Sequence, residues 1–265
     1  MQTDAPSFIE MREVSYTYPG WPTVVDRVSW SIRGGEFHSF VGRSGCGKTT
    51  LLKLAAGLLQ PQHGRILMEG RDVARPDPSM SFVFQSPTLL EWLSVLDNVL
   101  LPISLQRSAT AADHDAAANL LAQMGLSGYA GQSPKQLSGG QQSRVAIARA
   151  LITAPRVLLM DEPFAALDAI TREELQVELL RLCRTHSTAV LFVTHDINEA
   201  VYLSDRVGVM QAGRIRHDLP IDLPNLPNER ATALRYSPAF NHICAQLRDA
   251  MNQADDGNAV NAVIS

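Results

Sequence analysis

The feature that most constrains this chain is the octapeptide Gly-Arg-Ser-Gly-Cys-Gly-Lys-Thr at residues 42–49, which matches the pattern G-x-x-x-x-G-K-[ST]. Residues 36–41 precede it and read as a strand, and a helix is predicted at 48–58. The apolar stripe of that helix consists of Leu51, Leu52, Leu54, Ala55 and Leu58. A strand, a glycine-rich loop and a helix in this order direct backbone N–H groups and a helix dipole at one point, so the chain is expected to bind a phosphate there.

Each residue type in this loop has a chemical reason to be there. Lys48 is expected to reach the β- and γ-phosphates of a nucleotide, and the Thr49 hydroxyl to ligate Mg²⁺. A glycine-rich turn without a ligand is the alternative, and it leaves the Lys-Thr ending unexplained. The predicted nucleotide-binding residues are Gly42, Ser44, Gly45, Cys46, Gly47, Lys48, Thr49 and Thr50.

Two further buried strands end in polar residues. The apolar run 157–160 is followed by Asp161 and Glu162, and the run 189–194 is followed by His195. Ligand crevices of α/β sheets form at the carboxyl ends of strands. Asp161 is therefore a candidate Mg²⁺ ligand, Glu162 a candidate base for water attacking the γ-phosphate, and His195 a candidate γ-phosphate sensor. Solvated acids and a structural histidine are the alternative interpretation.

Composition and charge exclude several classes of protein. The net charge of -4 argues against a nucleic-acid-binding protein. No apolar run approaches the roughly 20 residues that cross a bilayer, and the first residues lack a signal peptide, so a cytosolic location is expected. Three widely spaced cysteines indicate reduced thiols, and Cys183 with His186 lacks the second pair that a zinc site needs.

The order of apolar segments predicts how the chain is organised. Residues 8–41 read as strands, and about 86–150 reads as a helical subdomain inserted in an α/β core. Prolines then interrupt the chain after Arg214. We therefore expect one domain at 1–225 and a short, partly disordered helical tail at 226–265, with residues 252–265 frayed.

The pentapeptide Leu-Ser-Gly-Gly-Gln at residues 137–141 is not explained by an ordinary phosphate-binding loop. It resembles the signature of the ATP-binding cassette (ABC) family, and the other motifs of that family follow in order over residues 8 to about 215. These are Walker A at 42–49, the Q-loop at Gln85, the signature at 137–141, Walker B at 157–162, the D-loop at 165–168 and the switch histidine at His195. The resemblance implies a P-loop NTPase core of mainly parallel sheet, with an N-terminal antiparallel β-subdomain and an inserted helical subdomain.

The resemblance also implies roles for residues outside the phosphate loop. Two copies would form a head-to-tail dimer in which the signature of one copy contacts the nucleotide of the other, through Ser138, Gly139, Gly140 and Gln141. Asp168 would carry communication across this interface, and Gln85 would sense Mg²⁺ and the γ-phosphate. Tyr18 aligns with the aromatic residue that stacks on adenine, and Tyr16 is the competing candidate.

The segment 84–102 resembles the ATPases of nitrate, taurine and aliphatic-sulfonate importers, a group that includes transporters of pyrimidine precursors. Such a subunit would hydrolyse ATP with Mg²⁺ at the cytoplasmic face of the inner membrane and move transmembrane permease subunits, supplied by an extracytoplasmic solute-binding protein. A DNA-repair or translation clamp and a stand-alone exporter subunit are the rival interpretations. A repair clamp would need a long coiled-coil insertion and a translation factor usually two cassettes, and this sequence shows neither.

Overall fold

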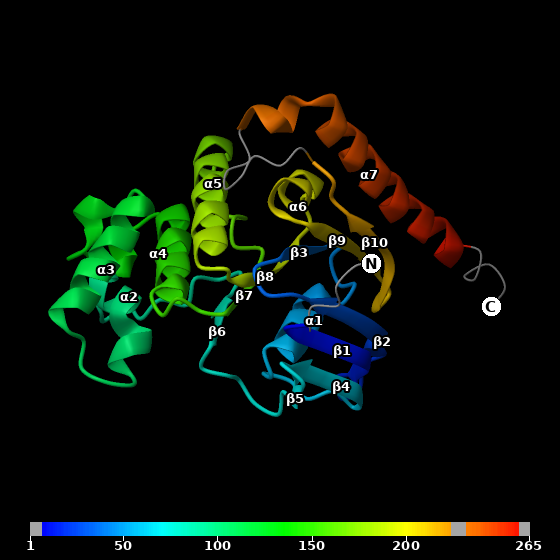
Figure 1. Ribbon diagram of the computed structural model, residues 1–265, viewed down its shortest axis with the longest axis horizontal. Helices are drawn as coiled ribbons and strands as arrows, with labels where there is room; N and C mark the ends of the chain where they lie inside the picture. Colours follow the sequence, from blue (N-terminus) through cyan, green and yellow to red (C-terminus); the bar gives the residue numbers. More distant parts are fainter. Residues whose placement is uncertain (1–6, 224–231, 260–265) are drawn as a thin grey trace. The chain divides into compact units, whose positions relative to one another are not determined.

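The computed structural model describes residues 7–223 and 232–259, and the chain divides into two compact units, 1–77 with 189–265 and 78–188 (Figure 1). The elements of the first unit are β1 Ile9–Thr17, β2 Thr23–Ile32, β3 Phe37–Val41, α1 Lys48–Ala55, β4 His63–Met68, β5 Arg71–Asp72, β8 Ala189–Thr194, α6 Ile197–Leu203, β9 Arg206–Gln211, β10 Arg214–Pro220, the 3₁₀ turn Thr232–Tyr236 and α7 Pro238–Ala259. Those of the second are β6 Met80–Val83, α2 Val95–Ser104, α3 Ala111–Gln123, the 3₁₀ turns Ser127–Tyr129 and Pro134–Gln136, α4 Gly139–Leu151, β7 Val157–Asp161 and α5 Ala169–Thr185.

The first unit contains two kinds of sheet. Strands β2, β1, β4 and β5 lie in that order and pair antiparallel, as the resemblance to the ABC family implies for the N-terminal β-subdomain. Strand β3 pairs parallel with both β8 and β9, and β10 returns antiparallel on β9. Every residue of β3 and β8 is buried, which explains the unbroken apolar run Ala189–Val193 in β8. Strand β3 buries two polar residues as well, His38 and Ser39.

Helices complete the core of this unit. Helix α1 contacts β2 and β8, α6 contacts β3 and β8, and α7 contacts α6 and β9. Helix α7 has an apolar face, since Phe240, Cys244 and Leu247 are buried. The backbone of this helix continues to Ala259, within the segment 252–265 that is predicted to fray. Residues 224–231 and 260–265 lie outside the described residues.

The predicted helix 48–58 is wrong at its C-terminal end, because α1 ends at Ala55. Gly57 takes φ +70°, and the N–H groups of Leu58 and Leu59 both donate to the Lys53 carbonyl, which closes the helix in a left-handed cap. Leu58 is consequently exposed and does not belong to the apolar stripe.

The second unit contains the parallel pair β6–β7 and the helices α2 to α5, and the predicted helical subdomain at about 86–150 falls within it. Helix α2 contacts both α3 and α4. Helix α4 also holds the loop after β6, because the Arg149 guanidinium donates to the carbonyls of Pro87 at 2.9 Å and Thr88 at 3.0 Å. Over the described ranges of both units, every helix is too short or too polar to cross a bilayer.

Asn98 in α2 fixes the start of this helical region. Its side chain is fully buried; its Oδ1 accepts from the Leu90 N–H at 2.8 Å, and its Nδ2 donates to the carbonyls of Leu90 at 3.0 Å and Ser94 at 2.9 Å. Asn98→Ala removes these three hydrogen bonds and takes the side-chain acceptor from the Leu90 N–H, so it is expected to lower the free energy of unfolding by about 2–3 kcal/mol. Chemical denaturation measures the free energy of unfolding, and Gln123→Ala, at an exposed position, is the control. A decrease in the free energy of unfolding below about 0.5 kcal/mol for Asn98→Ala would contradict the structure.

Candidate functional site

The loop between β3 and α1 has two glycines that no other residue can replace. A Cβ atom on Gly42 would lie 2.3 Å from the Met210 carbonyl oxygen, and one on Gly47 would lie 2.4 Å from the Val24 carbonyl oxygen. Gly47 also has φ +104°, a conformation that side chains disfavour. The backbone of this loop therefore lies directly against β2 and β9, which is the close packing that a phosphate-binding loop requires.

Lys48 is buried, although it carries a charge. Its Nζ donates to the carbonyl oxygens of Gly42 at 2.7 Å and Arg43 at 3.0 Å, and lies 3.9 Å from the Cys46 Sγ. Burial raises the pKa of the Cys46 thiol, and the neighbouring ammonium partly opposes that rise. Gly47 precedes the first residue of α1 and has no side chain to cap it, so the positive helix dipole and the Lys48 ammonium act at the same loop.

The remaining predicted residues of the loop differ in exposure. Ser44 and Gly45 are exposed at its tip, where a Cβ on Gly45 would meet no atom within 4 Å. Thr49 is half-buried and Thr50 is buried in the first turn of α1. The loop is thus closed on the side of the sheet and open at its tip, where a ligand could approach.

Tyr18 follows β1 and is half-buried; its Oη lies 3.4 Å from the Thr50 Oγ1. The rings of Tyr16 and Tyr18 meet edge to face with centroids 4.9 Å apart. Both aromatic candidates therefore belong to the phosphate-loop side of the first unit, and Tyr18 is the one that contacts α1. Since the two rings touch each other, this geometry leaves the choice of the adenine-stacking residue open.

His195 leaves the sheet beside the phosphate loop. Val41 of β3 pairs with Thr194 of β8 in parallel register, so Gly42 and His195 follow neighbouring strands at the same edge. The His195 side chain is exposed. The next residue, Asp196, caps α6 and thereby fixes the backbone on which the histidine sits. The predicted position of His195 at this edge is confirmed.

In the second unit, three predicted residues gather at the ends of two paired strands. Val83 of β6 pairs in parallel with Met160 of β7, so Gln85 and Glu162 leave the sheet at one edge. Asp161 is buried, Glu162 is half-buried and Gln85 is exposed. Glu162 has φ +46°, a strained conformation for a residue with a side chain, and such strain concentrates at functional positions. No residue pattern around Glu162 signals this strain.

The signature residues form the start of α4. The Ser138 Oγ accepts from the Gln141 N–H at 3.2 Å, and the Gln141 side chain accepts from the Ser138 N–H at 2.9 Å, which is a capping box. A Cβ on Gly140 would lie 2.9 Å from Leu167, and one on Gly139 would lie 3.8 Å from Ala166. Gly140 therefore allows the start of α4 to lie against the segment 165–168, whereas a Cβ on Gly139 would make only an ordinary van der Waals contact.

Asp168 ends that segment and has a structural role of its own. It caps α5, with its carboxylate accepting from the Thr171 N–H at 3.0 Å. This hydrogen bond lowers the pKa of Asp168. The carboxylate is exposed, so it remains accessible to a partner while it caps the helix.

Among the residues that the structure describes, no three His, Cys, Asp or Glu side chains are grouped to hold a metal ion. The predicted Mg²⁺ ligands Thr49, Gln85 and Asp161 are instead a hydroxyl, an amide and one carboxylate, all oxygen donors that suit Mg²⁺. Thr49 belongs to the first unit and the other two to the second. The donor chemistry fits a Mg²⁺ ion that also uses phosphate oxygens and water.

Known proteins resemble this chain over most of its length. The model of the ABC transporter family matches residues 25–165, more than half of the chain. An aliphatic sulfonates import ATP-binding protein of Xanthomonas axonopodis is 49% identical over 214 residues, covering 80% of this chain and 84% of the relative. A bicarbonate transport ATP-binding protein of Synechocystis is 43% identical over 230 residues, covering 80% and 79%.

Solved structures of ATP-binding cassettes also resemble this chain. A dimeric ATP-binding cassette in a post-hydrolysis state, bound to ADP and Pi, is 31% identical with a TM-score of 0.74, covering 81% of this chain and 99% of that chain. The likeness confirms the predicted fold class, a P-loop NTPase core with an antiparallel β-subdomain and a helical subdomain. The chain belongs to the ABC transporter family, as an ATP-hydrolysing, ATP-binding subunit of the importer type.

Proposed function

We propose that the chain binds ATP with Mg²⁺ at the phosphate loop 42–49 and powers the import of a small solute through a separate permease. The observation that carries the nucleotide site is the buried Lys48 ammonium, which the carbonyls of Gly42 and Arg43 hold at the start of α1. A buried cation costs free energy unless it is paired, so a loop that keeps one at a helix N-terminus is built to receive an anion.

Thr49, Gln85 and Asp161 would hold the Mg²⁺ ion, and a bound Mg²⁺ would neutralise part of the phosphate charge. Glu162 is the proposed base that accepts the proton of the attacking water, and its half-buried position suits that task. His195 and Gln85 are proposed to orient the γ-phosphate and the water. Tyr18 is proposed to stack on the adenine ring.

The active form is proposed to be a head-to-tail dimer of two copies. The exposed Ser138 and Gly139, at the N-terminus of the 13-residue helix α4, would bind the nucleotide held by the other copy. Asp168 is exposed and ends the segment 165–168, which packs against the start of α4. We propose that it meets the partner copy there. Nucleotide binding and dimerisation would then be thermodynamically linked.

The complete system would comprise this dimer at the cytoplasmic face of the inner membrane, transmembrane permease subunits and an extracytoplasmic solute-binding protein. Nucleic acid is not a proposed partner. The transported solute would be nitrate, taurine, an alkanesulfonate or a pyrimidine precursor. The relatives named for sulfonate and bicarbonate transport support an importer of small solutes, with an anion as the first choice to test.

The test is ATP hydrolysis by the full chain reconstituted with the permease and the solute-binding protein encoded beside it. We expect one of taurine, alkanesulfonates, nitrate, bicarbonate or pyrimidine precursors, presented on the solute-binding protein, to stimulate hydrolysis and to accumulate inside the vesicles. Export of a solute, or stimulation by DNA or ribosomes without any response to solutes, would overturn the importer proposal.

A further inference from the structure

The phosphate loop is held from behind by the turn that joins β9 to β10. The Gly213 N–H donates to the Cys46 carbonyl oxygen at 3.1 Å, and the Gly213 carbonyl accepts from the Asp26 N–H at 2.9 Å. One residue of the turn thus bonds to the phosphate loop with its N–H and to β2 with its carbonyl. Gly213 therefore links three segments that are far apart in the sequence: the β9–β10 turn, the phosphate loop and β2.

The backbone of this turn packs closely against β2. Ala212 has φ +45° and Gly213 has φ +77°, the paired positive angles of a two-residue hairpin turn. A Cβ on Gly213 would lie 2.7 Å from the Val24 carbonyl oxygen. Val24 is also the residue whose carbonyl lies against Gly47 of the phosphate loop. The turn and the loop therefore pack on the same point of β2.

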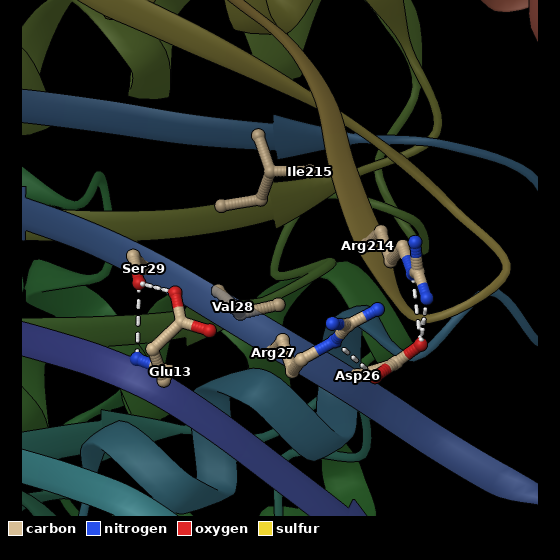
Figure 2. Close-up of a pocket in the computed structure, with 7 residues that line it drawn as sticks. All are labelled: Glu13, Asp26, Arg27, Val28, Ser29, Arg214 and Ile215. Carbon is tan, nitrogen blue, oxygen red and sulfur yellow. Dashed lines mark hydrogen bonds and ion pairs between the residues drawn. The ribbon is translucent and has the colours of Figure 1, made fainter.

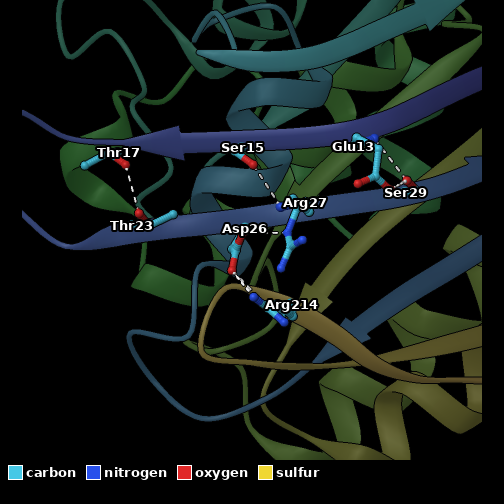
Figure 3. A network of polar contacts seen from close by, with 8 residues as sticks. All are labelled: Glu13, Ser15, Thr17, Thr23, Asp26, Arg27, Ser29 and Arg214. Atoms are coloured by element: carbon cyan, nitrogen blue, oxygen red, sulfur yellow. Dashed lines mark hydrogen bonds and ion pairs between the residues drawn. The ribbon is translucent and has the colours of Figure 1, made fainter.

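An ion pair fastens the turn to β2 (Figure 2). The Nε of Arg214, the residue after the turn, donates to the Asp26 Oδ2 at 2.8 Å, and a second guanidinium nitrogen donates to the same oxygen. The Arg27 guanidinium approaches the other carboxylate oxygen at 3.5 Å. Figure 3 shows Asp26 between the two arginines, in a polar network that continues along β1 and β2. Arg214 is the main cause of the lowered pKa of Asp26.

We propose that Asp26 and Arg214 are positioning residues for nucleotide binding, acting through the Gly213 N–H on the Cys46 carbonyl of the phosphate loop. The proposal rests on the proposed role of residues 42–49. A loop that binds phosphate with backbone N–H groups must hold several of these groups in fixed directions. If the loop is less ordered before binding, ordering it costs free energy and weakens the affinity for the nucleotide. The ion pair is partly exposed, so its removal leaves no buried charge and changes overall stability little.

The first test removes the ion pair and compares it with a matched pair. Arg65 and Asp72 form a two-bond, exposed ion pair in the antiparallel sheet of the same unit, at 3.1 and 2.7 Å. In the full-length protein, Asp26→Ala is expected to weaken binding of a non-hydrolysable ATP analogue by about three- to fivefold, the upper range for a partly exposed ion pair. Asp72→Ala is expected to leave the affinity unchanged, with a similar small shift in Tm. Equal affinities in the two variants would overturn the proposal.

The second test moves the turn itself. Gly213 and Gly70 both have φ +77°, but a Cβ on Gly70 would meet no atom within 4 Å. Alanine at either position therefore carries the same backbone strain, while only Gly213→Ala pushes against Val24. We expect Gly213→Ala to weaken analogue binding at least tenfold and Gly70→Ala to leave it unchanged. An equal effect of the two alanines on affinity would contradict the proposal, and Asp26→Ala decides it if Gly213→Ala does not fold.

A conservative variant separates positioning from general stability. Arg214→Lys keeps the charge but loses the second donor, and we expect it to recover more than half of the affinity that Arg214→Ala loses. No recovery would contradict the ion pair as the cause. Lys48→Ala is measured beside these variants. If Lys48→Ala still binds the analogue, the phosphate-loop role itself is refuted. If Lys48→Ala loses binding while Asp26→Ala binds as the unchanged protein does, only the positioning role is refuted.

Discussion

Lys48→Ala is expected to lower the affinity for ATP by about 100-fold, which corresponds to about 2.7 kcal/mol. The variant removes the only side-chain cation that the described structure places on the carbonyls of the phosphate loop, and it also removes the two hydrogen bonds to Gly42 and Arg43 that shape that loop. A hydrogen bond to a charged group typically contributes about 1.5–3 kcal/mol, which sets the size of the effect. Titration of the purified full-length chain with ATP and Mg²⁺ measures it.

Lys53→Ala is the matched control. Lys53 lies on the same helix, in its last turn, and carries the same charge, but its side chain is not hydrogen-bonded to the phosphate loop in the described structure. Lys53 is half-buried, and we expect the affinity of Lys53→Ala for ATP to stay within about twofold of the unchanged protein, since its charge lies at the opposite end of α1 from the phosphate loop. If Lys48→Ala bound ATP as well as Lys53→Ala does, residues 42–49 would not be the phosphate site.

Glu162→Gln is expected to reduce kcat for ATP hydrolysis by about 10²–10⁴-fold, the usual contribution of a positioned general base. Glutamine has nearly the same shape as glutamate but cannot accept the proton, so ATP affinity should stay within about threefold of the unchanged protein. With ATP bound and not consumed, the two copies should remain together. Light scattering in the presence of ATP and Mg²⁺ is expected to show a dimer for this variant and not for Lys48→Ala.

Glu174→Gln applies the same chemical change to an exposed residue of α5 in the same unit, and we expect its kcat to be unchanged. A normal kcat in Glu162→Gln would contradict the assignment of the base. Loss of ATP binding in Glu162→Gln, without loss of the folded state, would instead place Glu162 in nucleotide binding rather than in proton transfer. The positive φ of Glu162 makes the fold check necessary, because glutamine inherits the same backbone strain.

The sequence by itself determined the family, the fold class and the order of the motifs. Residues 42–49 and 157–162 could be located because their chemistry is local: glycines and a lysine at fixed spacing, and an apolar strand that ends in acids. The capping box at Ser138 and Gln141 is likewise local, since both partners lie within one helical turn. Local patterns of this kind need no knowledge of the rest of the chain.

Only the tertiary structure decided which distant segments support these motifs. Gly47 is adjacent to Val24, Gly42 to Met210 and Cys46 to Gly213, and no spacing rule connects such positions because sheet pairing brings them together. The short alternation before and after Ala212 would have allowed a hairpin to be predicted, but not its contact with the phosphate loop. The positive φ of Glu162 is also invisible in the sequence. Long-range backbone contacts depend on the whole sheet, so they are decided only when the chain has folded.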